Sequence, residues 1–109
     1  MSRFSDVVER LAQVIEGRRG ADQETSWSAR LIADRALAAK KLAEEALEAA
    51  LAAVQRDNAA LARESADLIY HWLAVLAGAG VSLDDVAGVL EEREGRSGID
   101  EKGARGSAP

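Results

Sequence analysis

The sequence RALAAKKLAEEALEAALAAVQR, residues 35–56, decides the fold because neither glycine nor proline interrupts its run of strong helix formers. It predicts one long helix. Small apolar side chains form an arc along it, namely Leu42, Ala46, Ala49, Ala50 and Ala53. We expect a neighbouring helix to approach closely on this arc, with the acidic side of the helix opposite it.

Five carboxylates form two helical patterns, Glu44-Glu45-x-x-Glu48 and Glu64-x-x-Asp67. At 100° per residue, the first three spread over roughly 100° of a helix and the last two stand one turn apart. If the two sides face each other, their charges repel unless a cation lies between them. Oxygen ligands favour Mg²⁺ or Mn²⁺ over Zn²⁺. The two patterns therefore indicate a divalent metal site suited to phosphate chemistry.

A solvated helix face is the alternative for the first pattern, because its acids follow two lysines and can form ion pairs within the helix. The second pattern borders an apolar arc formed by Leu61, Leu68, Trp72, Val75 and Leu76. Acids are rarely placed beside a packed surface without a partner. The second pattern therefore favours the metal site.

The remaining segments also have helical spacing. The helices expected along the chain are at about 4–15, 27–32, 35–56, 59–77 and 83–90. Ser26 or Thr25 offers an N-cap for the second helix, and Ser82 with Asp85 predicts a capping box for the last. Because no strand-like alternation and no internal repeat occurs, we predict an all-α fold of four to five helices.

Length and composition limit the size of the core. The chain has 109 residues, of which 48% are hydrophobic but only 4% aromatic. A small, alanine-rich domain buries little surface alone, so we expect a homodimer. Glycines, alternating charges and the only proline follow from residue 95, so we divide the chain into an all-α domain, 1–94, and a flexible tail, 95–109.

Charge argues against several partner classes. The chain has 14 basic and 19 acidic residues, a net charge of −5, and no basic run that would favour nucleic acid. Cysteine is absent, and charges recur too often for a membrane span. We expect a cytoplasmic protein with neither a nucleic-acid nor a membrane partner.

Four blocks carry a resemblance to a known family, and they are residues 24–31 (ETSWSARL), 40–48 (KKLAEEALE), 64–71 (ESADLIYH) and 80–86 (GVSLDDV). In order and spacing they resemble the phosphoribosyl-ATP pyrophosphohydrolases of histidine biosynthesis, members of the MazG-like all-α superfamily. The resemblance implies a dimer that builds a four-helix arrangement around each metal site. It also implies Mg²⁺-dependent hydrolysis of the α,β-phosphoanhydride of phosphoribosyl-ATP to phosphoribosyl-AMP and pyrophosphate. Phosphoribosyl-AMP cyclohydrolase, which takes the next step, is a candidate partner.

Within this resemblance, all five acids are candidate catalytic residues. We assign Glu45, Glu48, Glu64 and Asp67 as direct metal ligands, while Glu44 either completes the shell or orients a water molecule. Any carboxylate not fully engaged by metal can accept the proton of the attacking water.

The resemblance places Ser26, Ser28 and Arg30 in the substrate pocket. The serines could instead cap a helix, and a guanidinium suits phosphate because it donates two parallel hydrogen bonds. Trp27 could stack on adenine or serve packing alone.

Two lysines complete the candidate substrate contacts. Lys41 lies on the acidic side and either binds phosphate or pairs with Glu45, whereas Lys40, about 100° away, is better placed for solvent. His71, one turn past Asp67, is interpreted as orienting that carboxylate rather than as a catalyst.

Two other functions stay open. A house-cleaning nucleoside triphosphate pyrophosphatase would share the fold and the acids, and a noncatalytic helical dimerisation module could retain the acids alone. The Ser26-Trp27-Ser28 block and the complete set of acids favour the first function over both alternatives.

Overall fold

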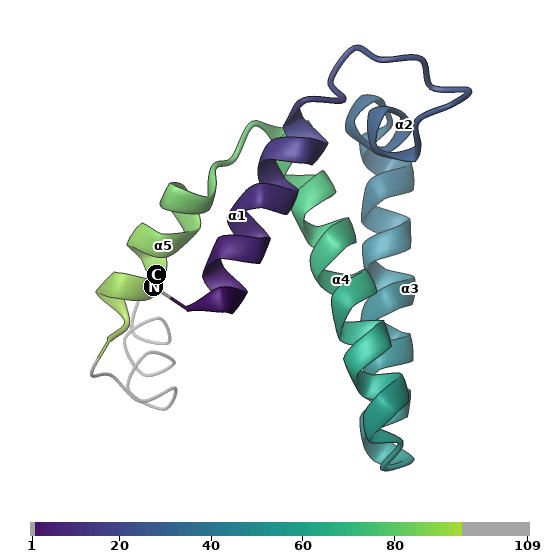
Figure 1. Ribbon diagram of the computed structural model, residues 1–109, viewed down its shortest axis with the longest axis vertical. Coiled ribbons are helices and arrows are strands. Elements are labelled where there is room, and N and C mark those ends of the chain that lie inside the picture. The colour runs from purple at the N-terminus through teal and green to yellow at the C-terminus, as the bar shows by residue number, and fades with distance from the viewer. Residues whose placement is uncertain (1, 95–109) are drawn as a thin grey trace, which may run out of the picture.

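The structure is a computed structural model that describes residues 2–94, and within that range the chain forms five helices and no strand (Figure 1). The helices are α1 (Arg3–Glu16), α2 (Trp27–Ala33), α3 (Arg35–Val54), α4 (Asn58–Ala79) and α5 (Leu83–Glu92). The all-α prediction is confirmed. The tail expected at residues 95–109 lies outside the described part of the chain.

Side-chain caps fix where the helices begin. The Ser26 hydroxyl accepts the Ala29 amide at 3.1 Å and starts α2, and Ser82 and Asp85 form the predicted capping box of α5. Asp34 both ends α2 and caps α3, whose first turn it holds through the Leu37 amide. Because one residue serves both helices, no loop separates α2 from α3.

The two longest helices, α3 and α4, lie side by side as an antiparallel pair (Figure 1). Residues 55–57 connect them, with Arg56 in the left-handed region at a φ of 59°. The Asp57 amide donates to the Ala52 carbonyl at 3.1 Å and closes the turn. A connection this short makes the two helices antiparallel neighbours.

The predicted packing arc of α3 is wrong. The buried residues of α3 are Ala38, Glu45, Ala49 and Ala52. Of the predicted arc, only Ala49 is among them. An alanine side chain removes little apolar area from water when it is buried, and α3 has alanines on every side. Their positions therefore do not decide which side of the helix packs. α3 buries the side that carries Glu45 and leaves Leu47 and Leu51 exposed.

The core forms around α4, which contacts α1, α2 and α3. Its buried members are Ile15, Leu31, Ala38, Leu73 and Ala74. Leu31 of α2 and Ile15 of α1 are the largest fully buried side chains. α2 therefore seals one part of the α3–α4 pair, close to the half of α4 that follows the acidic residues.

The end of α4 depends on two glycines with different roles. Gly78 lies inside the helix, just past the end expected at about residue 77, and a Cβ there would come within 3.1 Å of the Ile32 carbonyl oxygen of α2. Gly80 is the terminator: it adopts a left-handed backbone with a φ of 72°. The first glycine permits close packing of two helices, and the second permits the turn toward α5.

No single helix within residues 2–94 is both long and apolar enough to cross a membrane. Only α4 and α5 taken together reach that length and composition, as a pair bent by 105°.

We predict that Gly80→Ala lowers the free energy of unfolding by about 1 kcal/mol, because an L-residue is disfavoured in the left-handed region. In the described part of the chain, a Cβ at Gly80 would meet nothing within 4 Å, so the cost is conformational. Gly88→Ala inside α5 is the matched control, and it should stabilise by about 0.5–1 kcal/mol. Urea unfolding followed by circular dichroism, at one fixed protein concentration, measures both. Equal effects of the two substitutions would contradict the assigned role of Gly80.

Candidate active site

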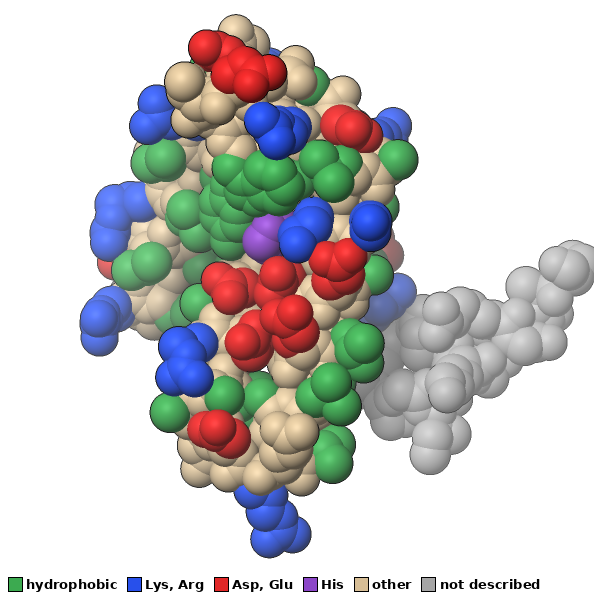
Figure 2. Space-filling model, turned by 90° about the vertical axis from the view of Figure 1, so that its right-hand side faces the viewer, with side chains coloured by type: hydrophobic (Ala, Val, Ile, Leu, Met, Phe, Trp, Pro, Cys, Tyr) green, Lys and Arg blue, Asp and Glu red, His purple; other side chains and the backbone are tan. Residues whose placement is uncertain are grey.

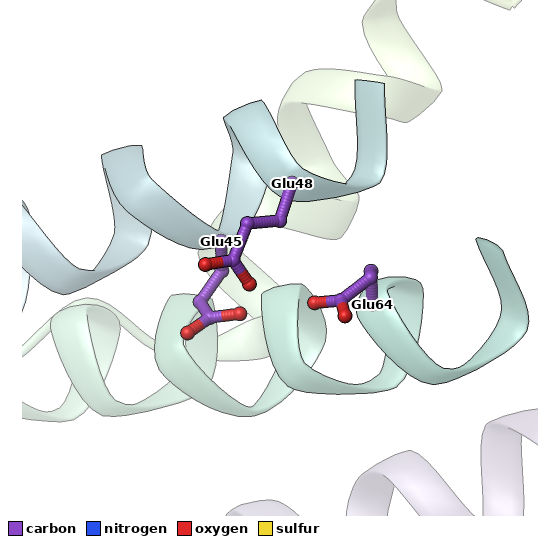
Figure 3. Close-up of side chains that lie close together, drawn as sticks. All are labelled: Glu45, Glu48 and Glu64. Atoms are coloured by element: carbon purple, nitrogen blue, oxygen red, sulfur yellow. The ribbon is translucent and has the colours of Figure 1, made fainter. Parts of the chain in front are cut away.

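Three carboxylates from the two long helices point toward one another (Figure 3). Glu45 and Glu48 come from α3 and Glu64 from α4, and each offers an oxygen within 4.8 Å of the others. Glu45 is only 8% exposed, Glu64 is half-buried and Glu48 is exposed. The group is therefore buried on the side of Glu45 and open to solvent on the side of Glu48.

Two oxygens of this group, Glu45 Oε2 and Glu64 Oε2, are buried and have no hydrogen-bond partner within residues 2–94. A buried acceptor without a partner costs free energy, and a charged one costs more. Burial and then repulsion from Glu48 raise the pKa of Glu45. The pKa of Glu64 is raised first by Glu48 at hydrogen-bonding reach, which favours a protonated carboxyl, and then by burial. A proton or a cation is needed here.

The donor set fits a divalent cation. Carboxylate oxygens are the ligands that Mg²⁺ and Mn²⁺ prefer, and a cation among the three side chains would satisfy both unpartnered oxygens. It would also offset the repulsion among like charges. The geometry thus accommodates a metal ion, which could enter from solvent on the side where Glu48 is exposed.

The other two predicted acids lie outside this group. Glu44 pairs with Lys41 at 3.0 Å, and this hydrogen bond lowers the pKa of Glu44 and raises that of Lys41. Asp67 is exposed, but its charge still raises the pKa of Glu45, which places it near the group. The structure thus brings together three of the four predicted metal ligands. Lys41 forms its ion pair with Glu44, not with Glu45 as considered from the sequence.

Acidic side chains gather on one face of the molecule, over α3 and α4, with basic side chains beside them (Figure 2). Lys40 is exposed, whereas Lys41 is half-buried. A phosphate chain approaching this face would meet carboxylates and ammonium groups together, and a divalent cation would be needed to reverse the local negative charge.

The candidate substrate residues of α2 have partners within the protein. Ser26 caps the helix, as its alternative interpretation held. The hydroxyl groups of Ser28 and Tyr70 lie 2.6 Å apart, and the Trp27 indole N–H donates to His71 Nε2 at 3.3 Å. The first turn of α2 is therefore fixed on α4.

Arg30 also has partners within the protein. Its guanidinium donates twice to the Gln23 carbonyl oxygen, at 3.2 and 3.0 Å, and lies 5.8 Å from the centre of the Trp27 ring. Arg30 thus fastens the segment before α2 and stacks over the indole.

The sequence interpretation of His71 was wrong in its detail. His71 Nδ1 bonds the backbone oxygen of Asp67 at 2.8 Å and does not touch the carboxylate, because a ring four residues on reaches that carbonyl. Tyr70 packs against the core and also forms a polar contact with Ser28. The signal in the sequence was two consecutive polar aromatic residues within an otherwise apolar run.

The fold and the facing acids define the class: an all-α protein of the MazG-like kind, with carboxylates brought together by two antiparallel helices. A sequence model described as Phosphoribosyl-ATP pyrophosphohydrolase matches residues 8–94. The chain belongs to this family, and it is a hydrolase.

Curated relatives agree over nearly their whole length. The chain is 59% identical to the phosphoribosyl-ATP pyrophosphatase of Caulobacter vibrioides (strain NA1000 / CB15N), over 94% of this chain and 96% of the relative. It is 52% identical to that of Cereibacter sphaeroides (strain ATCC 17029 / ATH 2.4.9), over 92% and 98%. A relative named phosphoribosyl-ATP pyrophosphatase in Parvibaculum lavamentivorans is 47% identical, over 97% and 98%.

We predict that the protein without divalent cation loses stability as the pH rises above about 4.3, the ordinary glutamate value. A carboxyl whose pKa is raised by folding stabilises below its unfolded pKa, and that contribution is lost as the pH rises through its folded pKa. The raised pKa values of Glu45 and Glu64 give this sign. Glu64→Gln should therefore be more stable than the native chain at neutral pH in chelator, with a flatter pH profile.

Urea unfolding in chelator and in MgCl₂ measures this prediction. Added Mg²⁺ should raise the free energy of unfolding of the native chain and raise that of Glu64→Gln much less, because binding to the folded state alone stabilises it. Glu92→Gln, at an exposed acid outside the group, is the control. A Glu64→Gln variant that is less stable than the native chain in chelator would refute the repulsion among these acids.

Proposed function

We propose that the protein hydrolyses the α,β-phosphoanhydride of phosphoribosyl-ATP, giving phosphoribosyl-AMP and pyrophosphate, with Mg²⁺ as cofactor and Mn²⁺ as a substitute. The observation that carries the proposal is that the carboxylates of Glu45, Glu48 and Glu64 lie together. Two of their own oxygens are buried and have no hydrogen-bond partner within the described residues. Family membership and relatives named for this substrate support its specificity.

The acids have different proposed roles because they differ in burial. Glu45 and Glu64 form the buried part of the metal site, and Glu48 forms its solvent side. Asp67, one turn from Glu64 on α4, supplies the fourth carboxylate of the proposed set. The bound cation would neutralise phosphate charge and stabilise the leaving pyrophosphate.

The attacking water must give up a proton. In the proposed mechanism a carboxylate that is not fully engaged by the metal takes it. Glu44 is available for this or for orienting the water, and its lowered pKa keeps it ionised. Its ion pair with Lys41 holds the carboxylate in place near the group.

The substrate contacts are proposed on the same face. Lys41 and Lys40 supply positive charge for the phosphate chain, whereas Trp27 and Ser28 of α2 hold the nucleoside end. Arg30 and Ser26 act by fixing α2 and the segment before it, since their polar groups already have partners.

One assay separates this function from its alternatives. Purified protein with Mg²⁺ is offered phosphoribosyl-ATP, dATP, dCTP and dUTP, and pyrophosphate release is measured. We expect turnover of phosphoribosyl-ATP well above that of the deoxynucleotides. Turnover confined to a deoxynucleotide would assign a house-cleaning pyrophosphatase, and none from a folded protein would assign a noncatalytic module.

Removing one carboxylate should abolish most turnover. We predict that Glu48→Gln and Asp67→Asn each lower kcat/KM by about 10²-fold or more, because each amide loses a charge needed for metal or proton transfer. Glu91→Gln, at an exposed acid of α5, is the matched control and should keep native rates. A folded Asp67→Asn variant with full Mg²⁺-dependent turnover would remove Asp67 from the site.

A homodimer is part of the proposal. Leu47, Leu51 and Val54 are 60%, 48% and 80% exposed and recur at helical spacing along α3. Such a stripe on a short chain favours burial in a second copy. We predict that Leu51→Lys weakens the dimer, shown by a concentration-dependent shift to the monomer mass in analytical ultracentrifugation. A native chain that is monomeric at all concentrations would contradict this.

A cytoplasmic location and a contact with phosphoribosyl-AMP cyclohydrolase complete the proposal. Both follow from the place of the reaction in histidine biosynthesis, where the product of this step is the substrate of the next. A chain free of cysteine is compatible with a reducing compartment.

A further inference from the structure

Two consecutive residues of α4 contact two consecutive residues of α2. The Trp27 indole N–H donates to His71 Nε2 at 3.3 Å, and the Ser28 and Tyr70 hydroxyl groups lie 2.6 Å apart. Trp27 and Ser28 are the first two residues of α2, a helix of only seven residues. A helix this short has little stability of its own, so these contacts fix where its first turn lies.

The two hydrogen bonds of His71 determine its tautomer. The indole nitrogen can only donate, so His71 Nε2 must be the acceptor and carry no proton. The backbone oxygen of Asp67 can only accept, so Nδ1 must carry the proton that it donates, at 2.8 Å. The ring is therefore neutral, with both nitrogens engaged. His71 is also only 8% exposed, so it is built as a fixed acceptor and not as a group that meets the substrate.

The indole of Trp27 is restrained from further directions. Its ring meets the His71 ring edge-on, with centroids 6.4 Å apart, while the guanidinium of Arg30 lies over it at 5.8 Å. Tyr70 in turn packs edge-on against His71 at 5.0 Å. Even so, Trp27 is 39% exposed. An aromatic side chain that is held on several sides and still open to solvent is suited to contact a ligand.

The same helix, α4, carries these anchors and part of the acidic group. His71 follows Glu64 by seven residues, which is about 10 Å along a helix axis. Figure 2 shows the only histidine of the chain at the boundary between the acidic patch and a hydrophobic patch. One rigid element thus sets the distance from metal site to Trp27.

Resting on the proposed function, we propose that His71 and Tyr70 are positioning residues, which hold Trp27 and Ser28 where the nucleoside end of the substrate binds. His71 acts as the neutral Nδ1–H tautomer and accepts the indole N–H. Tyr70 fixes the hydroxyl of Ser28. Neither residue exchanges a proton with the substrate, and the metal site is complete without them.

The contact can be tested without turnover, because the chain has a single histidine. Its ¹⁵N spectrum at mildly alkaline pH should show a protonated Nδ1 and an unprotonated Nε2. Trp27→Phe, which keeps an aromatic ring and removes the donor, should shift the Nε2 resonance. Trp72→Phe, the same change at the other tryptophan, should leave it near its native position. An Nε2–H tautomer, or an Nε2 unaffected by Trp27→Phe, would overturn the proposal.

Kinetics test the consequence for the substrate. His71→Leu removes the acceptor at similar volume, and the loss of one hydrogen bond should raise KM for phosphoribosyl-ATP about three- to tenfold with little change in kcat. His71→Gln, which offers a carbonyl acceptor, should recover most of the native KM. In the Trp27→Phe background, His71→Leu should add little, because the two residues act through one contact.

The outcomes distinguish this proposal from the function beneath it. If the native chain releases no pyrophosphate from any nucleotide, the proposed function is wrong and the positioning role falls with it. Native turnover together with a His71→Leu variant of unchanged KM, or with additive effects of His71→Leu and Trp27→Phe, overturns the positioning role alone. If His71→Leu changes the half-saturating Mg²⁺ concentration by a larger factor than it changes KM, His71 acts on the metal site and the positioning role is wrong.

Discussion

Close packing of α3 on α4 through alanine side chains is the constraint on which the site depends. Ala38, Ala49 and Ala52 are buried and add little bulk between the helices. The side chains of Glu45 and Glu64 can then meet across the gap, although their charges oppose that approach. The apolar contacts made by Leu31 and Leu73 have to hold the pair together against this repulsion. The candidate cation site is thus an electrostatically unfavourable part of an otherwise ordinary helical core.

α4 links the parts of the molecule that the function needs. It presents Glu64 and Asp67 in its first half, Tyr70 and His71 in its middle, and the core residues Leu73 and Ala74 directly afterwards. The acids, the anchors of α2 and the main apolar contacts are therefore in fixed register along one helix. A disturbance of the core beside α2 would reach Trp27 before it reached the acidic group.

The sequence predicted the helices and the five acids because both are local properties. Helix formers without Gly or Pro, the Ser26 and Ser82 caps, and acids at helical spacing do not depend on distant residues. The packed side of α3 was predicted wrongly, since alanine carries too little apolar area to indicate a direction.

The contacts of Ser28 with Tyr70 and of Trp27 with His71 could not be predicted either, because each joins residues more than forty positions apart. Arg30 illustrates the same limit: its donors go to a backbone oxygen, and no side-chain pattern records such a partner.

Asp34 couples the end of α2 to the start of α3. It terminates α2 and caps α3, so there is no flexible residue between them. Fraying of α2 would strip the cap from the first turn of α3, and loss of that turn would release α2. The amide hydrogens of both segments should then exchange with solvent in one cooperative opening, and the helix that carries Trp27 has no hinge about which to swing.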